Sequence, residues 1–269
     1  MIKNTVIYKV AFFCSLLAGF FTFTDLQISI LLVNKQAGWA DFLQRFGELP
    51  GLFLLYSATI IYLSEYHPAP EFKKIFVLVF LYSAAIYLSR FIFISIYSGL
   101  TGSYVFVDNN RWMIILVLAV FNLLIIFPFR RLKFSERTLR FSKVSILLGL
   151  FGYLLSVQPL KHLWGRVRFR DLDPLYSNFT PWFVPNFLSG GQSMPSGHSA
   201  MAWVLLPLLI LIPAKNKKLR ILLLLLIIAW GLTVCLSRIV IGAHYASDVL
   251  VGACIVIFIF YELSKEIYS

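Results

Sequence analysis

The sequence predicts an all-α fold, a polytopic bundle of about eight transmembrane helices that forms a single membrane domain over residues 1–269. Of the 269 residues, 59% are hydrophobic and 13% are charged, and the mean hydropathy is +0.83. This composition is too apolar for an ordinary soluble domain. The apolar residues also form long runs separated by short polar segments, which leaves no room for an independent soluble domain.

Eight apolar runs approach the length of about 20 residues that a helix needs to cross a bilayer. They lie roughly at 7–33, 49–64, 74–98, 111–129, 144–162, 198–213, 219–238 and 246–263. The second run is short, so seven spans are the alternative to eight. The first run is too long for the core of a signal peptide and lacks a clear cleavage site, so we expect it to remain as the first helix.

The basic residues predict how these helices are oriented. The chain has 24 Lys and Arg against 12 Asp and Glu, a net charge of +12. Most of the Lys and Arg lie near the termini and in the alternate connections 65–74, 130–143 and 214–220. Because such residues gather on the cytoplasmic side, we expect a multi-pass protein of the cell (inner) membrane whose other connections face the periplasm or exterior. Contact with anionic membrane lipids also suits this charge, and nucleic-acid binding is not expected.

Residues 34–48 alternate aromatic and charged side chains, which is typical of a segment at the membrane surface, with a plain connecting loop as the alternative. The residues are Trp39, Phe42 and Phe46 with Asp41, Arg45 and Glu48. Two ionisable residues, Asp25 and Arg90, lie inside apolar runs. Because neither belongs to a motif, we expect a structural pairing or an interfacial position for them.

Residues 163–197 form the longest polar segment of the chain. Its four prolines and the Gly190-Gly191 pair exclude a single helix. Its aromatic residues suit the headgroup level, where the segment would either admit a lipid sideways or form an ordered cap with no gating role. These aromatic residues are Tyr176, Phe179, Trp182, Phe183 and Phe187.

Three short blocks supply the groups that phosphoryl transfer needs, which are a cradle for the phosphate oxygens, a nucleophile and a proton donor. Lys161 and Arg168, with six residues between them, and Arg238 place three permanent cations at the outer ends of two apolar helices. Arginine can bind two phosphate oxygens at once. Each residue alone would more often be a cation reaching for the membrane surface. Together with the other blocks they indicate an anion site.

The second block is Pro195-Ser196-Gly197-His198, directly before an apolar run. Ser196 is expected to cap a helix there, while Gly197 and the following backbone N–H groups face an anion. A lone histidine at this place would be an interface residue. In the company of the cations, we assign His198 as the general acid that protonates the departing lipid oxygen.

The third block, at 237–248, contains His244 and Asp248. The two residues are four apart, so they share one face if a helix begins near Ala243. We expect Asp248 to orient the imidazole of His244, whose far nitrogen attacks phosphorus to form a phosphohistidine. The alternative role for Asp248 is that of a helix cap.

In letters, the blocks read K-x6-R, P-S-G-H and S-R-x5-H-x3-D, which resembles the type 2 phosphatidic acid phosphatase (PAP2) family of membrane lipid phosphatases. The resemblance covers residues 161–248. It implies a helical bundle that joins the blocks outside the cytoplasm and cleaves lipid phosphate monoesters or pyrophosphates without a metal or other cofactor. The family's site then falls on Lys161, Arg168, Ser196, Gly197, His198, Arg238, His244 and Asp248.

The chain departs from the family pattern in two places. The family's first block usually ends Arg-Pro, whereas Phe169 follows Arg168 here, so we expect a looser local turn. The family core usually has six membrane helices, and this chain has two more near its N-terminus. Neither departure removes a reacting group, but both bear on which lipid is preferred.

We therefore expect a metal-independent phosphatase of lipid-linked phosphate. Undecaprenyl pyrophosphate, phosphatidylglycerophosphate, phosphatidic acid and lipid A phosphate are compatible substrates. A phosphotransferase that uses the same site and a non-catalytic membrane protein that binds anionic lipids are the alternatives. The pairing of His198 with His244 and Asp248 argues against pure binding, and a lipid-embedded chain argues against a haloperoxidase. The three cysteines lie in apolar runs without metal-ligand spacing, so they are expected to be packing residues.

Overall fold

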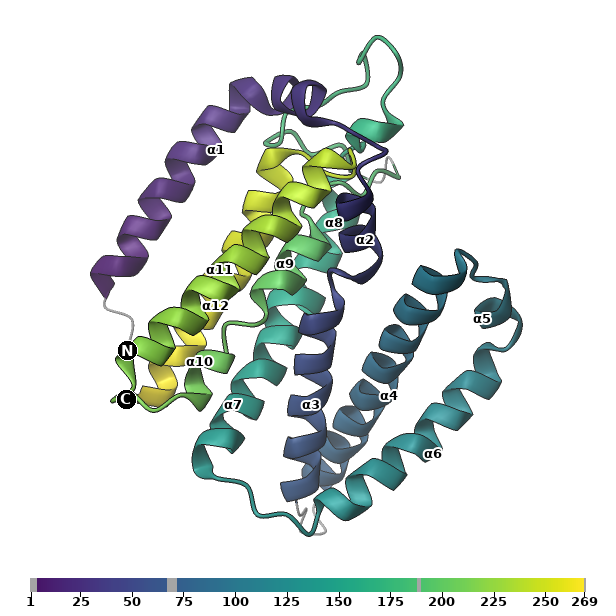
Figure 1. Cartoon of the computed structure of the whole chain (residues 1–269), viewed down its shortest axis with the longest axis vertical. Coiled ribbons are helices and arrows are strands. Elements are labelled where there is room, and N and C mark those ends of the chain that lie inside the picture. The colour runs from purple at the N-terminus through teal and green to yellow at the C-terminus, as the bar shows by residue number, and fades with distance from the viewer. Residues whose placement is uncertain (1–3, 67–71, 188–189, 269) are drawn as a thin grey trace.

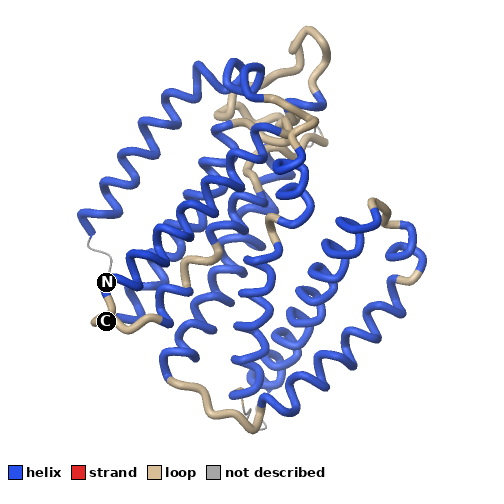
Figure 2. Tube along the Cα trace, in the orientation of Figure 1, coloured by secondary structure: helices blue, strands red, loops and turns tan. Residues whose placement is uncertain are grey.

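The computed structural model describes residues 4–66, 72–187 and 190–268, which form helices and loops without a strand (Figure 2). The longer helices are α1 (Asn4–Leu32), α3 (Leu49–Glu65), α4 (Phe72–Thr101), α6 (Arg111–Phe129), α7 (Glu136–Leu147), α11 (Lys217–Val240) and α12 (Ala246–Tyr268). The shorter ones are α2 (Gly38–Phe46), α5 (Val105–Asn109), α8 (Gln158–Trp164), α9 (Gly197–Trp203) and α10 (Leu208–Leu211). A π-helical stretch, η1 (Leu148–Val157), joins α7 to α8, and η2 (Phe169–Asp171) is a single 3₁₀ turn.

Seven helical segments of the described chain are long and apolar enough to cross a membrane. An eighth, Gly197–Leu211, is shorter and contains a turn at 204–207. Successive segments run up and down between the two ends of the bundle (Figure 1). These findings confirm the predicted fold class, a polytopic helical bundle of about eight spans. The short second run reaches full length because α2 continues it, so that the span covers Gly38–Glu65.

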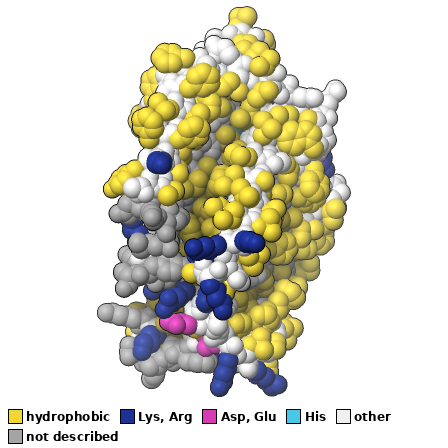
Figure 3. All heavy atoms as spheres, turned by 60° about the vertical axis from the view of Figure 1, so that its left-hand side comes forward, with side chains coloured by type: hydrophobic (Ala, Val, Ile, Leu, Met, Phe, Trp, Pro, Cys, Tyr) yellow, Lys and Arg dark blue, Asp and Glu magenta, His cyan; other side chains and the backbone are white. Residues whose placement is uncertain are grey.

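The two ends of the bundle carry different segments. In Figure 1 the end of α8, the start of α9 and the α11–α12 turn lie together at the top, near α2. The end of α12 and the connections 130–135 and 212–216 lie toward the bottom. On the face drawn in Figure 3, hydrophobic side chains cover most of the surface, and Lys and Arg gather toward the lower end. The three motif blocks therefore share the end opposite these basic connections.

The core surrounds α9, which is packed between α3, η1, α11 and α12. The backbone of Ser196, just before α9, approaches Gly252 of α12 so closely that no Cβ would fit there. Helix α1 packs against α12, whereas α4 and α6 pack against α3 on the side away from α11 and α12 (Figure 1). Helices α4 and α6 therefore stand apart from the motif-bearing helices.

Residues 34–48 contain the helix α2, so this segment is not a plain loop. Trp39 and Phe42 are exposed on it, as suits a helix at the membrane surface. Asp25 forms the predicted structural pair, because its Oδ2 lies 3.0 Å from Nη2 of Arg166. Arg90 has no ion-pair partner among the described residues. Cysteines 14, 235 and 254 are free thiols.

The loop between α8 and α9 lies at the upper end of the bundle (Figure 1). Trp182 donates its indole N–H to Ala18 O at 3.2 Å and to Thr22 Oγ1 at 3.0 Å, both on α1. The indole of Trp164 donates to Trp182 O at 2.6 Å. These bonds tie the middle of the loop to two helices, which agrees with an ordered cap.

The turn after Arg168 is tightly held although Phe169 replaces the family's proline. The Phe169 ring is 8% exposed, stacks on Tyr176 with ring centroids 5.8 Å apart, and meets Tyr245 edge-on at 6.3 Å. The next backbone N–H, that of Arg170, donates to Gly242 O at 2.9 Å. Aromatic packing and this backbone bond thus hold the turn after Arg168 in place.

Candidate active site

A polar cavity of about 710 Å³ opens at the upper end of the bundle, a size typical of ligand sites. Its walls come from α2, α4, η1, α8, α9 and α11, from Glu48 at the N-cap of α3, and from the loops that carry Arg168 and His244. Six of the eight predicted site residues line it, namely Lys161, Arg168, Gly197, His198, Arg238 and His244. The fold therefore brings together all three motif blocks. The other two predicted residues, Ser196 and Asp248, are fully buried behind its wall.

The three cations present hydrogen-bond donors that the protein does not use. Among the described residues, Lys161 Nζ makes a single long bond, of 3.4 Å, to Gln192 O. Arg238 is 3% exposed, yet its Nε and Nη1 have no acceptor among the described residues, and neither has Nε of Arg168. Buried donors without acceptors are rare in folded proteins because each lost bond is costly. An anion with several oxygens would satisfy these donors.

The turn at the C-terminal end of α8 directs the following segment toward the cavity. Gly165 adopts a left-handed conformation, with φ of 60°, and donates its N–H to Lys161 O at 3.2 Å. A residue with a Cβ would be strained there. The chain then turns so that Arg166 points into the protein and Arg168 lines the cavity.

His244 is held in one tautomer by a backbone carbonyl. Its Nδ1 lies 2.5 Å from Ser193 O, and a carbonyl oxygen can only accept, so Nδ1 carries the proton. The lone pair of Nε2 is then free. Burial lowers the pKa of His244 to about 3, which favours the neutral ring. Asp248 Oδ2 is 3.8 Å from Nδ1, beyond hydrogen-bond length, so our expectation that Asp248 holds the ring directly does not match the geometry.

Asp248 instead anchors the structure behind His244. It accepts bonds from Arg166 Nη1 at 2.7 Å, from Ser193 Oγ at 2.5 Å and from the Tyr245 N–H at 2.9 Å. The last bond is a cap at the start of α12, which we had considered as the alternative role. Asp248 thus acts on His244 through Ser193, whose hydroxyl it binds and whose carbonyl binds the imidazole.

Arg166 is the centre of the buried polar network. It is 0% exposed and donates to Asp248, to Asp25 Oδ2 at 3.0 Å, to Ser247 Oγ at 2.9 Å and to Thr180 O at 2.9 Å. Its guanidinium also lies 3.9 Å from the centre of the Tyr245 ring, a cation–π contact. Ser247 in turn donates its hydroxyl and its N–H to Asp25. Within the described part of the chain, the side-chain polar groups of Arg166, Asp25, Ser247 and Asp248 are all paired, whereas the Tyr245 hydroxyl has no partner.

Ser196 is a cap rather than a group facing the cavity. Its Oγ accepts from the Ser199 N–H at 3.3 Å and from Ser199 Oγ at 3.0 Å. Its own N–H donates to Asp248 O at 3.0 Å. The capping expectation is confirmed, while substrate contact through the Ser196 side chain has no support in this geometry. Gly197, the next residue, does line the cavity.

His198 has an acceptor on each side of its ring. Nδ1 lies 3.0 Å from Glu48 Oε1, and Nε2 lies 3.0 Å from Gln44 O. The side chain of Gln44 accepts from Arg170 Nη1 at 3.0 Å and from Arg238 Nη2 at 3.4 Å. The segment at α2 that sequence patterns placed at the membrane surface therefore also forms a wall of the cavity.

Sequence reasoning missed several residues of this region. They are Gln44, Glu48, Arg166, Arg170 and Ser193. Arg166 and Arg170 had a signal, since a cation every second residue from 166 to 170 is unusual in so apolar a chain. Ser193 and Gln44 had none, because each contacts a histidine through its backbone carbonyl, a group that every residue has.

Comparison with known families identifies the motif-bearing part of the chain. The family model described as "PAP2 superfamily" matches residues 142–266, which include all eight predicted site residues. No curated protein and no solved structure matches the chain. The apolar helices and this match fit a membrane phosphatase. This match agrees with the family that the three motifs predicted, since residues 142–266 match the PAP2 superfamily model.

Proposed function

We propose that the protein is a membrane phosphatase that hydrolyses lipid-linked phosphate or pyrophosphate through a phosphohistidine on His244. The observation that carries this proposal is the set of unpaired donors of Arg168 and Arg238, which face the same cavity as the free Nε2 of His244. A phosphoryl group placed on these donors meets a nucleophile already in the tautomer needed for attack. The site needs no metal, because Lys161, Arg168 and Arg238 supply the positive charge.

In the proposed reaction, Nε2 of His244 attacks phosphorus and the bond from phosphorus to the lipid oxygen breaks. That oxygen takes a proton from His198 and leaves as an alcohol or as a lipid monophosphate. Water then attacks the phosphohistidine, gives its proton to His198 and releases phosphate. The cations bind the phosphoryl oxygens throughout, and Asp248 steadies His244 through Ser193.

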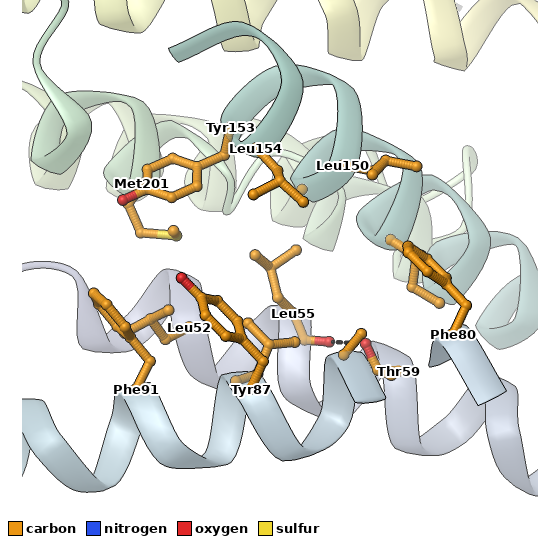
Figure 4. A pocket seen from close by; sticks show the side chains of 14 residues that line it. Leu52, Leu55, Thr59, Phe80, Tyr87, Phe91, Leu150, Tyr153, Leu154 and Met201 are labelled. Carbon is orange, nitrogen blue, oxygen red and sulfur yellow. Dashed lines mark hydrogen bonds between the residues drawn. The ribbon is translucent and has the colours of Figure 1, made fainter. Parts of the chain in front are cut away.

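An apolar groove beside the cavity supports a lipid substrate. It has a volume of about 110 Å³ and lies between α3, α4 and η1 (Figure 4). Phe91 and Tyr153 line both the groove and the polar cavity. A Cβ built on Gly197 would meet Tyr153 Oη at 3.5 Å, so the hydroxyl end of Tyr153 reaches the phosphate side while its ring faces the groove. A hydrocarbon chain attached to a bound phosphate fits this arrangement.

The charge asymmetry favours a site on the periplasmic or exterior face of the cell membrane. There the substrate class includes undecaprenyl pyrophosphate, phosphatidylglycerophosphate, phosphatidic acid and lipid A phosphate. Each has an anionic phosphate at the headgroup level and a hydrocarbon chain in the bilayer. The loop between α8 and α9, with Phe183 and Phe187 exposed, suits that same level of the membrane.

The proposal is tested by incubating purified protein with these lipids in excess EDTA and measuring free phosphate. We expect phosphate release in EDTA and inhibition by vanadate, which adopts the shape of phosphorus in transfer. Release that requires a second lipid as acceptor would instead identify a phosphotransferase. Binding without release or transfer would leave only an anionic-lipid-binding protein. Loss of activity on chelation, restored by a divalent ion, would refute the metal-free mechanism.

Two histidine variants separate the proposed roles. His244→Ala removes the nucleophile, so activity should vanish for every substrate and no acid-labile phosphoenzyme should be trapped. His198→Ala removes the proton donor, a loss of about 10²- to 10⁴-fold that should be largest for a lipid alcohol. An activated aryl phosphate should lose less, because its leaving group needs no proton. An equal loss across both substrates, with chemistry rate-limiting, would show that His198 only binds phosphate.

A further inference from the structure

The contacts of His198 cross the boundary of the family match. His198 lies within residues 142–266, but both atoms that contact its ring nitrogens come from outside them. Glu48 stands at the N-cap of α3, and Gln44 lies in α2. The bend between these two helices therefore places a carboxylate and a carbonyl on opposite sides of one imidazole.

This arrangement needs one proton more than a neutral imidazole beside an ionised carboxylate would carry. Gln44 O can only accept a hydrogen bond, and an ionised Glu48 can only accept as well. A neutral imidazole has a single N–H, so one of its nitrogens would direct a lone pair at an oxygen 3.0 Å away. A ring with a proton on each nitrogen satisfies both contacts. The same proton count results if the extra proton lies on Glu48 and is shared with Nδ1.

The surroundings make Glu48 necessary for that state. The charged groups that face His198 are Glu48 from α3, Arg238 from α11 and Lys161 from α8. Burial of the ring and the two cations oppose a positive charge on His198, whereas the Glu48 carboxylate and the Gln44 carbonyl favour it. Glu48 is 14% exposed and His198 is 23% exposed as side chains, so water screens their attraction only partly.

We propose that Glu48 is a positioning residue that holds His198 doubly protonated, ready to give a proton to the leaving oxygen. This inference rests on the proposed function, in which His198 is the acid. Glu48 keeps its hydrogen bond with Nδ1. The N–H of Nε2 releases its hydrogen bond to Gln44 O and donates to the leaving oxygen instead. The bond from Nε2 to hydrogen breaks as the bond from oxygen to hydrogen forms, and the imidazole becomes neutral.

The test compares Glu48→Gln with Glu65→Gln, the same substitution at the far end of α3. Glu65 accepts a bond from the Phe134 N–H at 3.0 Å and does not line the cavity, so the control should keep wild-type rates. An opposite charge at this distance shifts a pKa by about one to three units. Glu48→Gln should therefore move the basic limb of the pH profile of kcat down by about one unit or more. Near neutral pH it should slow a lipid alkyl phosphate by about tenfold and an aryl phosphate less.

Two further variants distinguish proton control from a structural role. Glu48→Asp keeps the charge, so it should restore part of the rate and of the pH profile. Adding Glu48→Gln to His198→Ala should cost little more than His198→Ala alone, since both changes remove the same proton transfer. An unshifted pH profile, an equal loss on alkyl and aryl phosphates, or additive losses in the double variant would overturn the proposal.

A measurement without turnover separates this proposal from the proposed function. Nitrogen-15 NMR of histidine-labelled protein in lipid nanodiscs should show an imidazolium signal that His198→Ala removes. Glu48→Gln should move its titration to lower pH. That result in a protein that releases no phosphate would refute the function and keep the Glu48 pairing. A His198 that is neutral at all pH values where the protein is folded, in a protein that does release phosphate, would refute the pairing alone.

Discussion

Two arginines two residues apart should show different defects when each is replaced by glutamine, a loss of stability for one and a loss of activity for the other. Arg166 is fully buried and binds two carboxylates, whereas Arg168 lines the cavity with an unpaired Nε. Arg166→Gln should unfold the protein more easily because Asp25 and Asp248 remain buried without their cation. Arg168→Gln should leave the fold intact and remove a group that binds phosphate.

The size of each effect follows from the contacts. Removing one partner of a buried ion pair costs about 3–5 kcal/mol, because the remaining charge stays desolvated. Arg166 serves two such pairs, so the upper part of this range is expected. For a chain of this size, each kcal/mol lowers Tm by about 2–4 °C, which gives a loss of roughly 10 °C or more. Arg168 forms no ion pair with another described residue, so the change in Tm of Arg168→Gln should be within about 2 °C.

The assay combines thermal unfolding in detergent with phosphate release at a temperature where both variants are folded. Arg168→Gln should lose about 10²- to 10³-fold in kcat/KM, as when a donor to a developing anion is removed. Asp25→Asn with Arg166 intact should destabilise less than Arg166→Gln, since one carboxylate partner remains. Equal Tm losses for the two arginine variants, or a stable Arg166→Gln, would refute the assignment of inward and outward roles.

Three other predictions concern the membrane side, the groove and the aromatic turn. Single cysteines at Leu175 and Lys217 should react with an impermeant reagent from opposite sides of the membrane, and labelling of both from one side would refute the topology. Ala84→Phe, which fills the groove, should lower kcat/KM for long-chain lipid phosphates more than for short-chain ones. Ser83→Phe, on the exposed face of the same helix, is its control, and equal effects would refute the groove as a lipid site. Phe169→Pro should lower Tm because the buried ring is lost. The backbone at Arg168 is already extended, as a following proline requires, so it should not add strain. An unchanged Tm would show that the ring contributes little to stability.

Features that depend on residues close together in the sequence could be predicted. Apolar runs of span length gave the helices, because a bilayer forces each crossing to satisfy its own backbone bonds. The three blocks gave six cavity-lining residues, because each block combines reactive side chains at short fixed spacing. Charge patterning placed the basic connections at one end of the bundle. None of these inferences needed to know which helices touch.

The contacts that cross between distant segments could not be predicted in this way. Glu48 and His198 are 150 residues apart, and Asp25 and Arg166 are 141 apart, so no periodicity links them. Asp248 was assigned to His244 because they are four apart, but the tertiary structure places Arg166 and Ser193 at that carboxylate. A backbone carbonyl then takes the place expected for the carboxylate. Spacing showed that the two residues are neighbours, but not which bond they make.

The N-terminal helices complete the electrostatics of the proposed reaction. Behind His244, Asp25 and Asp248 flank the single cation of Arg166. Asp25 accepts from Arg166 and twice from Ser247, which suits an ionised carboxylate. With both carboxylates ionised the network has a net charge of −1, which favours the positive charge that His244 gains on forming phosphohistidine. Glu48 does the same for His198. In the proposed reaction, each histidine is thus supported by a carboxylate from a segment that precedes residues 142–266, which is Glu48 for His198 and Asp25, acting through Arg166, for His244.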